Sequence, residues 1–462
     1  MRALLLLSAA AALLACAAAS VAPRVAPLPA ELAAGDAAGP PAQLVLVSVG
    51  GLTPERYREG GGMPALAAFA AAGVAAEGVA PVVPAAVYPA HATLLTGVVP
   101  SQHGVLADQL IGERGIRRSQ PRHASRLRAP TLWQRVAESG GTVAAFDWPT
   151  TAGAQIASLL PDLVPERSGE RWQDLVAESA TPWIAERVAK APPEVAEPGA
   201  ARDTLLVDLA CASLAQSPRL VLLRLRGGEV WLAAEGPRGA EVGPAFAQVD
   251  QELARLVRCA ARSGRLAELA LVVVGDRALL AAHTALRPNA WLREEGLIGA
   301  QGRWKALARS NGGSAFVYAT DPQSALLARR RLESAAEQSN AFRVVSAEEM
   351  IRRQADREAW FGLEADPGFV FDDASASPAI VSSRLRGAGG YLDDGAALHA
   401  GFVAFGRGVR RGLDVPQMSQ LDVAPTLAAL LGVPLEPTAG RALVGLLRVG
   451  PAGARAHPAR PR

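Results

Sequence analysis

The residues of this chain that could do acid–base or metal chemistry are a few carboxylates and histidines. Gly275 ends the apolar run 269–274, and Asp276 and Arg277 come next. A divalent cation needs three or four carboxylate, imidazole or thiolate ligands at fixed geometry. The chain has no CxxC pair and no His/Cys cluster, and its histidines are scattered: His91, His103, His123, His283, His399 and His457. This spacing does not predict a metal centre formed by histidines. We expect the side chains of His91 and His103 to form hydrogen bonds within the protein.

One motif nevertheless points to phosphate-ester chemistry. It reads AVYPAHATLLTG over residues 86–97 and is followed by Pro100 and by His103-Gly104. The motif resembles the nucleophile region of the type I phosphodiesterases and nucleotide pyrophosphatases, which belong to the alkaline phosphatase superfamily. This resemblance covers roughly residues 42–447 and implies a centre in which two zinc-type ions activate a threonine. The chain has Val87 at that position, and valine offers no oxygen for a covalent intermediate.

The other positions that the resemblance marks as chemical are also altered. Asp108 stands where relatives carry an asparagine that donates to the transferring group, and its charge would repel an anionic ester. Among the metal-ligand positions, Asp276 is unchanged and Glu229 keeps a carboxylate on a longer stem. The remaining ligand positions hold side chains that cannot serve: Gly50, Ala233, Arg277 and Gly389. Even the loss of a group that only orients a metal ligand weakens metal binding or activity ~10- to 100-fold. Losing these ligands themselves should therefore leave no transition-metal site.

The sequence therefore predicts a pseudoenzyme that needs no cofactor and binds an unknown ligand or an envelope protein. Two alternatives stay open. The chain could be an active metal-dependent phosphodiesterase or nucleotide pyrophosphatase with two zinc-type ions, substituted ligands and a displaced nucleophile. It could also be a subunit that stabilises an active relative.

Arg277 carries a specific hypothesis about how the centre changed. A guanidinium could replace lost cationic charge and pair with Asp276 and Glu229, whose carboxylates would be costly to bury unpaired. The alternative is a surface arginine turned to solvent. Two further carboxylates near predicted strand or helix ends, Asp147 and Asp208, are interpreted as caps.

The elements that must position these residues alternate along the chain. Continuous apolar runs predict buried strands at 44–49, 78–83, 142–146, 220–225, 269–274 and 401–405. Helical spacing predicts helices at 63–73, 131–139, 203–215, 245–263 and 422–432. This alternation predicts an α/β fold with a mostly parallel sheet and helices on both faces, here an alkaline-phosphatase-like sandwich. Residues 291–387 are expected to form a small α+β insertion that shapes the entrance of the cleft implied by the family resemblance.

The N-terminus has the features of an export signal. Arg2 precedes an apolar run too short for a membrane span, and LLAC at 13–16 resembles a bacterial lipobox with Cys16 as the lipidated residue. The alternative is an ordinary signal peptide cut after residues 17–19. We expect residues 1–16 to be the signal, 17–43 a disordered tether, 44–447 the folded domain and 448–462 a disordered tail. The predicted location is the periplasm or the bacterial envelope, with a lipid anchor as the only membrane contact.

Composition and cysteine content limit the remaining possibilities. Hydrophobic residues make up 50% of the chain, which is enough for a sizeable core. The formal charge is only +3 and no basic stripe with interleaved aromatics occurs, so nucleic-acid binding has little support. Cys211 and Cys259 fall in separate predicted helices, and separate buried thiols are favoured over a disulfide, although an exported compartment would permit one.

Overall fold

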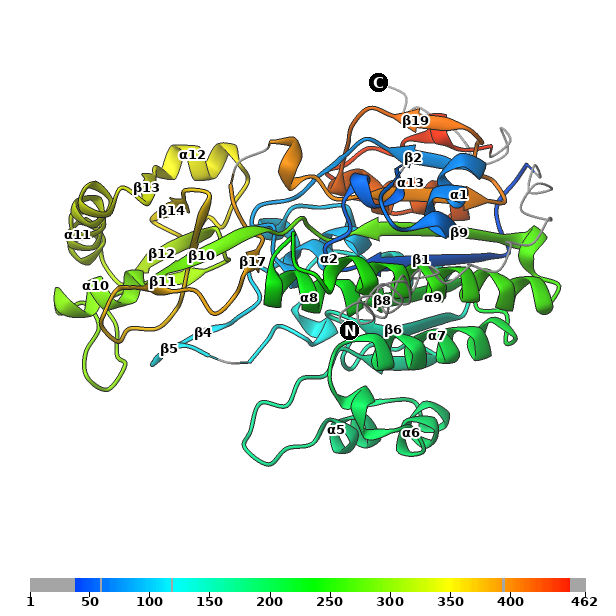
Figure 1. The fold of residues 1–462 in the computed structure, drawn as a ribbon, viewed down its shortest axis with the longest axis horizontal. Coiled ribbons are helices and arrows are strands. Elements are labelled where there is room, and N and C mark those ends of the chain that lie inside the picture. Colours follow the sequence, from blue (N-terminus) through cyan, green and yellow to red (C-terminus); the bar gives the residue numbers. More distant parts are fainter. Residues whose placement is uncertain (1–37, 59, 118, 393–394, 449–462) are drawn as a thin grey trace, which may run out of the picture.

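The computed structural model describes residues 38–58, 60–117, 119–392 and 395–448. The predicted signal peptide, Cys16, most of the predicted tether and residues 449–462 of the predicted tail lie outside this part. The described chain forms a large α/β body with a smaller lobe at one end (Figure 1). Within these ranges, no helix has both the length and the apolar character needed to cross a membrane.

The body is built on an eight-stranded sheet with β1 (Gln43–Val49) near its middle. β1 pairs in parallel with β8 (Leu220–Leu225) on one side and with β9 (Leu269–Gly275) on the other. Beyond β8 lie β6 (Val143–Trp148) and β7 (Ser158–Pro161), both parallel. Beyond β9 lie β18 (Phe402–Gly406), which is antiparallel, then β2 (Val74–Ala76) and β19 (Leu413–Val415). The predicted mostly parallel sheet is confirmed.

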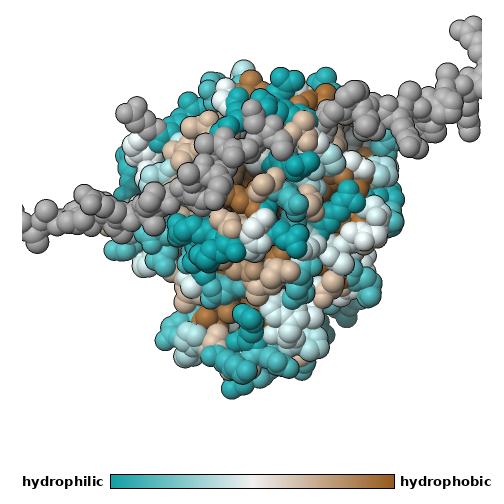
Figure 2. Space-filling model, turned by 90° about the vertical axis from the view of Figure 1, so that its right-hand side faces the viewer, coloured by the Kyte–Doolittle hydropathy of each residue, from teal (hydrophilic) through white to brown (hydrophobic). Residues whose placement is uncertain are grey.

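Alternating side chains of β1 show why helices cover both faces of this sheet. Every residue of β1 is buried, and successive side chains point to opposite faces. Val45, Val47 and Val49 pack on the side of α1 (Pro64–Ala72), α5 (Trp172–Ser179), α6 (Pro182–Ala189), α7 (Ala200–Leu214), α8 (Gly227–Glu235) and α9 (Val242–Arg262). Leu44 and Leu46 pack on the side of α2 (Val87–Thr96), α4 (Leu132–Glu138) and α13 (Val423–Leu431). The end of the body away from the lobe shows hydrophilic and hydrophobic residues interspersed where it is uncovered (Figure 2).

One predicted strand is largely absent from the sheet. The run 78–83 contributes only β3 (Val79–Ala80), which pairs with β20 (Met418–Ser419) outside the central sheet. Pro81 and Pro84 explain the difference, because proline has no N–H for a ladder of hydrogen bonds. The place in the sheet is taken by β2, which directly follows α1.

The expectation of separate thiols is wrong, because Cys211 and Cys259 form a disulfide. Cys211 lies on α7 and Cys259 on α9, and their Cα atoms are 5.6 Å apart. The two helices pack side by side on one face of the sheet. Helical spacing within each segment could not reveal that these two positions face each other across the helix pair.

The predicted α+β insertion is observed as the lobe. Its core is a four-stranded antiparallel sheet in the order β11 (Ala306–Ser310), β12 (Ser314–Ala319), β14 (Phe361–Ala365) and β13 (Phe342–Val345). Helices α10 (Pro288–Glu294), α11 (Pro322–Ser339) and α12 (Ala347–Arg352) accompany it. The connection from the body is β10 (Leu280–Leu286), which pairs with β15 (Gly368–Phe371), β16 (Ile380–Ser382) and β17 (Gly387–Ala388). A short hairpin of β4 (Ile111–Gly112) and β5 (Gly115–Ile116) reaches from the body toward the lobe (Figure 1).

Candidate functional site

The central strands end together at one edge of the sheet, and this brings the predicted site positions together. Val49 of β1 is in register with Leu225 of β8 and with Gly275 of β9. The residues just after these strand ends, including Gly50 and Asp276, therefore meet at the carboxyl edge. In open parallel sheets this edge is the usual place for ligand and catalytic sites.

Glu229 fills the space beside Gly50. A Cβ atom at position 50 would lie 2.6 Å from Oε2 of Glu229 and 2.8 Å from its Cβ. An aspartate could not be placed at position 50 unless Glu229 moved. The backbone here faces the other carboxylate, since the N–H of Gly51 donates to Oδ1 of Asp276 over 3.1 Å.

Arg277 pairs with both carboxylates, which confirms the pairing hypothesis, and the solvent-exposed alternative is wrong. Its Nη2 lies 2.7 Å from Oε1 of Glu229, its Nη1 bonds Oδ2 of Asp276, and its side chain is only 12% exposed. Burial alone would lower the pKa of Arg277, but the charges of Asp276, Glu229 and Asp108 outweigh it and raise the pKa. The guanidinium is therefore held as a permanent cation.

Two more arginines converge on Glu229 from strand β8 and the start of α8. Nη2 of Arg224 lies 3.2 Å, and Nε of Arg226 3.4 Å, from its Oε2. Burial would raise the pKa of Glu229, but Arg277, Arg224 and Arg226 together hold it well below its usual range. We call Arg224, Arg226, Glu229, Asp276 and Arg277 the ion network.

The other altered ligand positions lie around this ion network. A Cβ atom at Gly389 would lie 3.0 Å from Cδ of Arg277, so the arginine side chain fills the space beside position 389. Ala233 follows Glu229 by one turn of α8 and packs against the apolar core of that face. Neither residue offers a metal ligand.

Asp108 binds the N-terminus of α2, the helix that begins with Val87. The N–H of Val87 donates to Oδ2 of Asp108 over 3.2 Å, and the N–H of Tyr88 to Oδ1 over 2.8 Å. Free N–H groups at a helix start form an anion site. Burial raises the pKa of Asp108, whereas Arg277 and the two amides oppose the rise. The chain thus supplies its own anion where a phosphoryl group could otherwise bind.

The motif histidines are buried and hydrogen-bonded, as expected. Nε2 of His91 lies 2.8 Å from Oγ of Ser48, and its Nδ1 lies 2.7 Å from the carbonyl oxygen of Val87. Nε2 of His103 lies 3.1 Å from Oγ1 of Thr93. Burial lowers the pKa of His91 well below its usual value and that of His103 to about 3, so both are neutral. They support the scaffold of α2.

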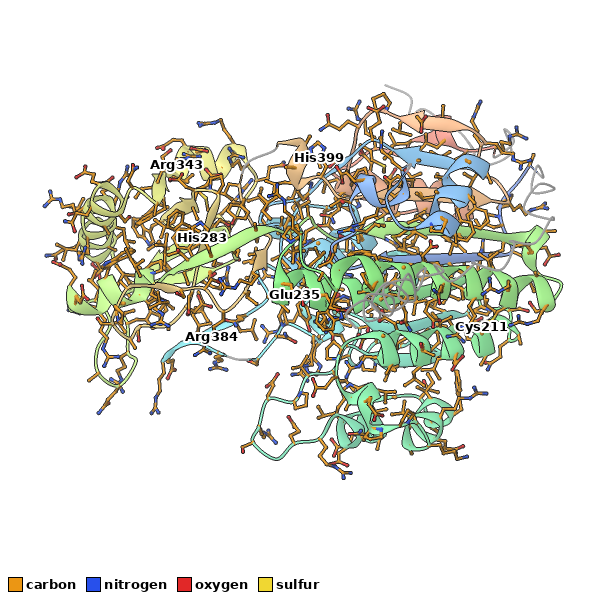
Figure 3. The ribbon with its side chains drawn as sticks, viewed as in Figure 1. Cys211, Glu235, His283, Arg343, Arg384 and His399 are labelled. Carbon is orange, nitrogen blue, oxygen red and sulfur yellow. A yellow bond between two sulfur atoms is a disulfide. The ribbon has the colours of Figure 1, made fainter. Side chains whose placement is uncertain are left out.

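The remaining histidines do not join the site. His283 lies on β10 and His399 at the junction between lobe and body (Figure 3). His123 forms a bridge with Ala152, and His457 lies outside the described residues. Across the described ranges, no group of three or more His, Cys, Asp or Glu side chains could hold a metal ion.

The residues present therefore do not fit the pair of zinc-type ions that the family resemblance implies. The two remaining carboxylates, Asp276 and Glu229, already direct oxygens at a guanidinium. The positions that would complete two coordination shells hold glycine, alanine and arginine. Each zinc ion would need about three protein ligands, which this arrangement does not offer.

The sequence analysis missed Arg224, Asp162 and Tyr88, which form contacts next to the ion network. Arg224 is 1% exposed and lies 3.6 Å from Oδ2 of Asp162, which also accepts a hydrogen bond from the Tyr88 hydroxyl over 2.8 Å. The signal was a charged residue in the apolar run LVLLRL, where a strand buried on both faces needs a partner for each charge.

The two cap predictions are wrong. Asp147 lies fully buried in β6, with φ at 55° and its Oδ1 3.8 Å from Nη1 of Arg202. Asp208 lies within α7 and pairs with Arg255 of α9. Because α7 begins at Ala200, earlier than predicted, Asp208 stands in the helix interior rather than near an end.

The sheet, the helices on both faces and the lobe define an α/β protein of the alkaline phosphatase superfamily type. The model of the type I phosphodiesterase / nucleotide pyrophosphatase family matches residues 44–392, and the chain belongs to this family.

Solved structures of related proteins share the fold. Human ectonucleotide pyrophosphatase / phosphodiesterase 5 is 19% identical, with a TM-score of 0.64 over 88% of this chain and 99% of that one. The murine protein, as an inactive variant in complex with AMP, is 18% identical with a TM-score of 0.63 over 88% and 99%. A second structure of the murine protein gives 18% identity and a TM-score of 0.62. No curated protein matches the chain.

Proposed function

We propose that this chain is a non-catalytic member of its family, exported to the cell envelope, where it works by binding or scaffolding. The observation that carries this proposal is the position of Arg277, whose guanidinium bonds Asp276 and Glu229 and fills the space beside Gly389. A fixed cation of the protein takes the place that mobile metal cations would need.

The start of α2 supports the same proposal. Family chemistry through a covalent intermediate needs an oxygen nucleophile, and Val87 has none. The amides of Val87 and Tyr88, which could bind a phosphoryl oxygen, are used by Asp108. An anionic ester would have to displace this carboxylate and meet its charge.

The rival is an active hydrolase with a displaced nucleophile, and its hydroxyl candidates are poorly placed. Ser48 has the hydrogen bond to a histidine that a nucleophile would need, but it is fully buried within β1. The Tyr88 hydroxyl donates to Asp162 and is also buried. No observation favours this rival over a binding role.

The disulfide supports export. Bridges such as Cys211–Cys259 persist in oxidising compartments and are rare in reducing ones. Export and lipidation at Cys16 are tested by mass spectrometry of the mature protein, since a lipid on Cys16 and a cut after residues 17–19 give different N-terminal peptides.

The decisive experiment measures metal and turnover on the same sample. The purified mature protein is dialysed against zinc, and its zinc content and its hydrolysis of a p-nitrophenyl phosphodiester are determined with and without chelator. We expect less than one bound zinc ion per chain and no hydrolysis above the uncatalysed rate. Two bound ions with chelator-sensitive hydrolysis would overturn the proposal. Asp276→Asn is the matched control, because zinc bound at the old centre should be lost in this variant.

The role of a stabilising subunit for an active relative is a variant of the same proposal. It differs in one outcome, since an envelope extract would then yield the tagged chain together with a chelator-sensitive phosphodiesterase. Turnover that follows the relative and is absent from the isolated chain would favour the subunit role.

A further inference from the structure

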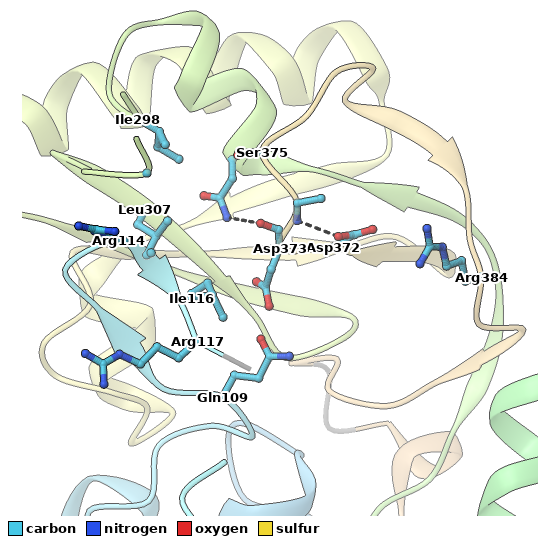
Figure 4. A pocket seen from close by; sticks show the side chains of 14 residues that line it. Gln109, Arg114, Ile116, Arg117, Ile298, Leu307, Asp372, Asp373, Ser375 and Arg384 are labelled. Atoms are coloured by element: carbon cyan, nitrogen blue, oxygen red, sulfur yellow. Dashed lines mark hydrogen bonds between the residues drawn. The ribbon is translucent and has the colours of Figure 1, made fainter. Parts of the chain in front are cut away.

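A separate cavity of about 610 Å³ lies between the β4–β5 hairpin and the lobe (Figure 4). This volume is in the range of small-molecule sites. Arg114 and Arg117 line it from the hairpin, and Asp372, Asp373 and Arg384 line it from the lobe. None of the residues of the ion network lines this cavity, which we call the hairpin–lobe cavity.

Hydrogen bonds fix both sides of the cavity in place. On the hairpin side, Nε1 of Trp304 in the lobe donates to the carbonyl oxygen of Gly112 over 2.9 Å. On the lobe side, Nδ2 of Asn289 donates to the carbonyl oxygens of Asp373 and Ala308, over 3.0 and 2.8 Å. The segment that carries Asp373 is thereby tied to the lobe sheet, and the cavity is preformed.

The arginines of the cavity differ from those of the ion network because they lack partners. Arg114, Arg117 and Arg384 are exposed, and among the described residues none of their guanidinium groups has a hydrogen bond or an ion pair. Asp373 lies in the middle of the cavity, with Arg114 and Arg117 to one side and Arg384 to the other (Figure 4). A guanidinium offers a fixed fork of donors that suits carboxylate or phosphate oxygens.

Asp373 adds an acidic group at the centre. Its Oδ1 accepts the N–H of Ser310 over 2.7 Å, while its neighbour Asp372 lies 3.5 Å from Nε of Arg287. Burial raises the pKa of Asp373 to about 7; the Ser310 amide opposes this rise, Asp372 adds to it and Arg309 also opposes it. Asp373 is therefore a carboxyl group that a ligand cation would ionise.

We infer that the hairpin–lobe cavity binds a small acidic zwitterion of the amino-acid or short-peptide type. Its anionic groups lie against Arg114, Arg117 and Arg384, and its ammonium group lies against Asp373. The excess of unpaired arginines selects a net negative ligand, and the central carboxylate selects one that also carries a cation. The inference rests on the proposed function only in that the chain works by binding.

The first test compares matched probes by calorimetry at low ionic strength, where screening is weak. The probes are glutamyl-glutamate, its N-acetylated form, which lacks the ammonium group, and lysyl-lysine, which reverses the charge. We expect glutamyl-glutamate to bind about tenfold more tightly than the acetylated form and lysyl-lysine not to bind, since a desolvated charge-assisted contact is of this size. Absence of binding by glutamyl-glutamate, or equal affinity for the acetylated form, would overturn the inference.

The second test assigns the binding to the cavity. Arg114→Gln with Arg117→Gln should weaken glutamyl-glutamate binding about tenfold, whereas Arg330→Gln, an exposed arginine on α11 outside the cavity, should leave it unchanged. Asp373→Asn keeps an acceptor for the Ser310 amide and should abolish the difference between the free and acetylated probes. Equal binding by the double arginine variant and the wild type would contradict the assignment.

These outcomes are independent of the zinc and turnover measurements. A chain that binds zinc and hydrolyses esters but also binds glutamyl-glutamate keeps this inference and loses the proposed function. A chain without metal, turnover or dipeptide binding keeps the proposed function and loses this inference.

Discussion

The ion network and the hairpin–lobe cavity contain the same kinds of charged side chain but differ in how these charges are paired. In the ion network, Glu229 faces Arg224, Arg226 and Arg277 within 3.4 Å, and the charges satisfy one another. In the hairpin–lobe cavity, Arg114, Arg117 and Arg384 lie around Asp373, and within the described part of the chain their guanidinium groups form no ion pair (Figure 4). The charges of the ion network are paired by groups of the protein, whereas the arginines of the hairpin–lobe cavity are available to a ligand.

This difference separates structural charge from binding charge. Burying an ion pair costs desolvation free energy, which is offset only while the two charges stay paired. A ligand that entered the ion network would therefore have to break these pairs before binding. Unpaired exposed arginines have little effect on the stability of the fold, and they are free to pair with an anionic ligand. The chain keeps the fold of its family, and at the carboxyl edge of its sheet its own arginines balance the charges of Glu229 and Asp276.

The largest expected effect breaks the ion network. Glu229→Gln removes the carboxylate that three arginines share, and we expect a loss of about 3–5 kcal/mol in the free energy of unfolding, measured with urea. The matched control is Glu138→Gln, which removes an exposed pair with Arg135 and should cost less than about 1 kcal/mol. A loss below about 1 kcal/mol for Glu229→Gln would mean that the network is not structural.

The second effect provides a scale far from both regions. Replacing Cys211 and Cys259 together by serine opens a loop with a sequence separation of 48, and we expect a loss of about 2–4 kcal/mol. Urea unfolding of the variant against the oxidised wild type measures it. Dipeptide binding should be unchanged, because neither cysteine lines the hairpin–lobe cavity. If reductant alone leaves the wild type as stable as before, the bridge is not formed in solution.

The sequence predicted the sheet well because its strands are buried on both faces. Runs such as 44–49 and 220–225 are apolar apart from Ser48 and Arg224, and they differ from observed β1 and β8 by one residue at most. The prediction failed for 78–83, where prolines end the pairing, and for the cysteines, whose contact depends on how α7 and α9 pack. Local pattern determines an element more directly than it determines the neighbour of that element.

The sequence predicted several residues of the site but not how all of their charges are paired. Aligning motifs placed Gly50, Glu229 and Arg277 together, and the Arg277 pairing followed from the cost of unpaired carboxylates. Arg224 and Arg226 were missed because no pattern within their own segment states that they face Glu229. The unpaired arginines of the hairpin–lobe cavity could not be predicted at all, since pairing is a property of the folded chain.

The third effect concerns pH and has opposite signs in the two regions. The folded pKa of Glu229 is held low, so its stabilising contribution is present above its usual pKa and is lost as the pH falls. The folded pKa of Asp373 is raised to about 7, so its contribution is present below its usual pKa and is lost as the pH rises through about 7. Between pH 5 and about 8.5, the wild type should lose about 1 kcal/mol relative to Asp373→Asn, a value reduced for partial exposure of the carboxyl. Urea unfolding at several pH values measures this difference, and parallel curves for the two proteins would contradict it.

The smallest effect on stability is the sharpest test of the comparison. Arg114→Gln with Arg117→Gln removes two charges that have no ion pair in the described ranges, so the free energy of unfolding should change by less than about 0.5 kcal/mol. Arg277→Gln, by contrast, breaks two contacts of the ion network and should destabilise the chain clearly in the same urea assay. Unchanged stability combined with weaker dipeptide binding would mark the hairpin arginines as ligand-binding groups. A loss above about 1 kcal/mol in the double variant would instead place them with Arg277, as charges that hold the fold together.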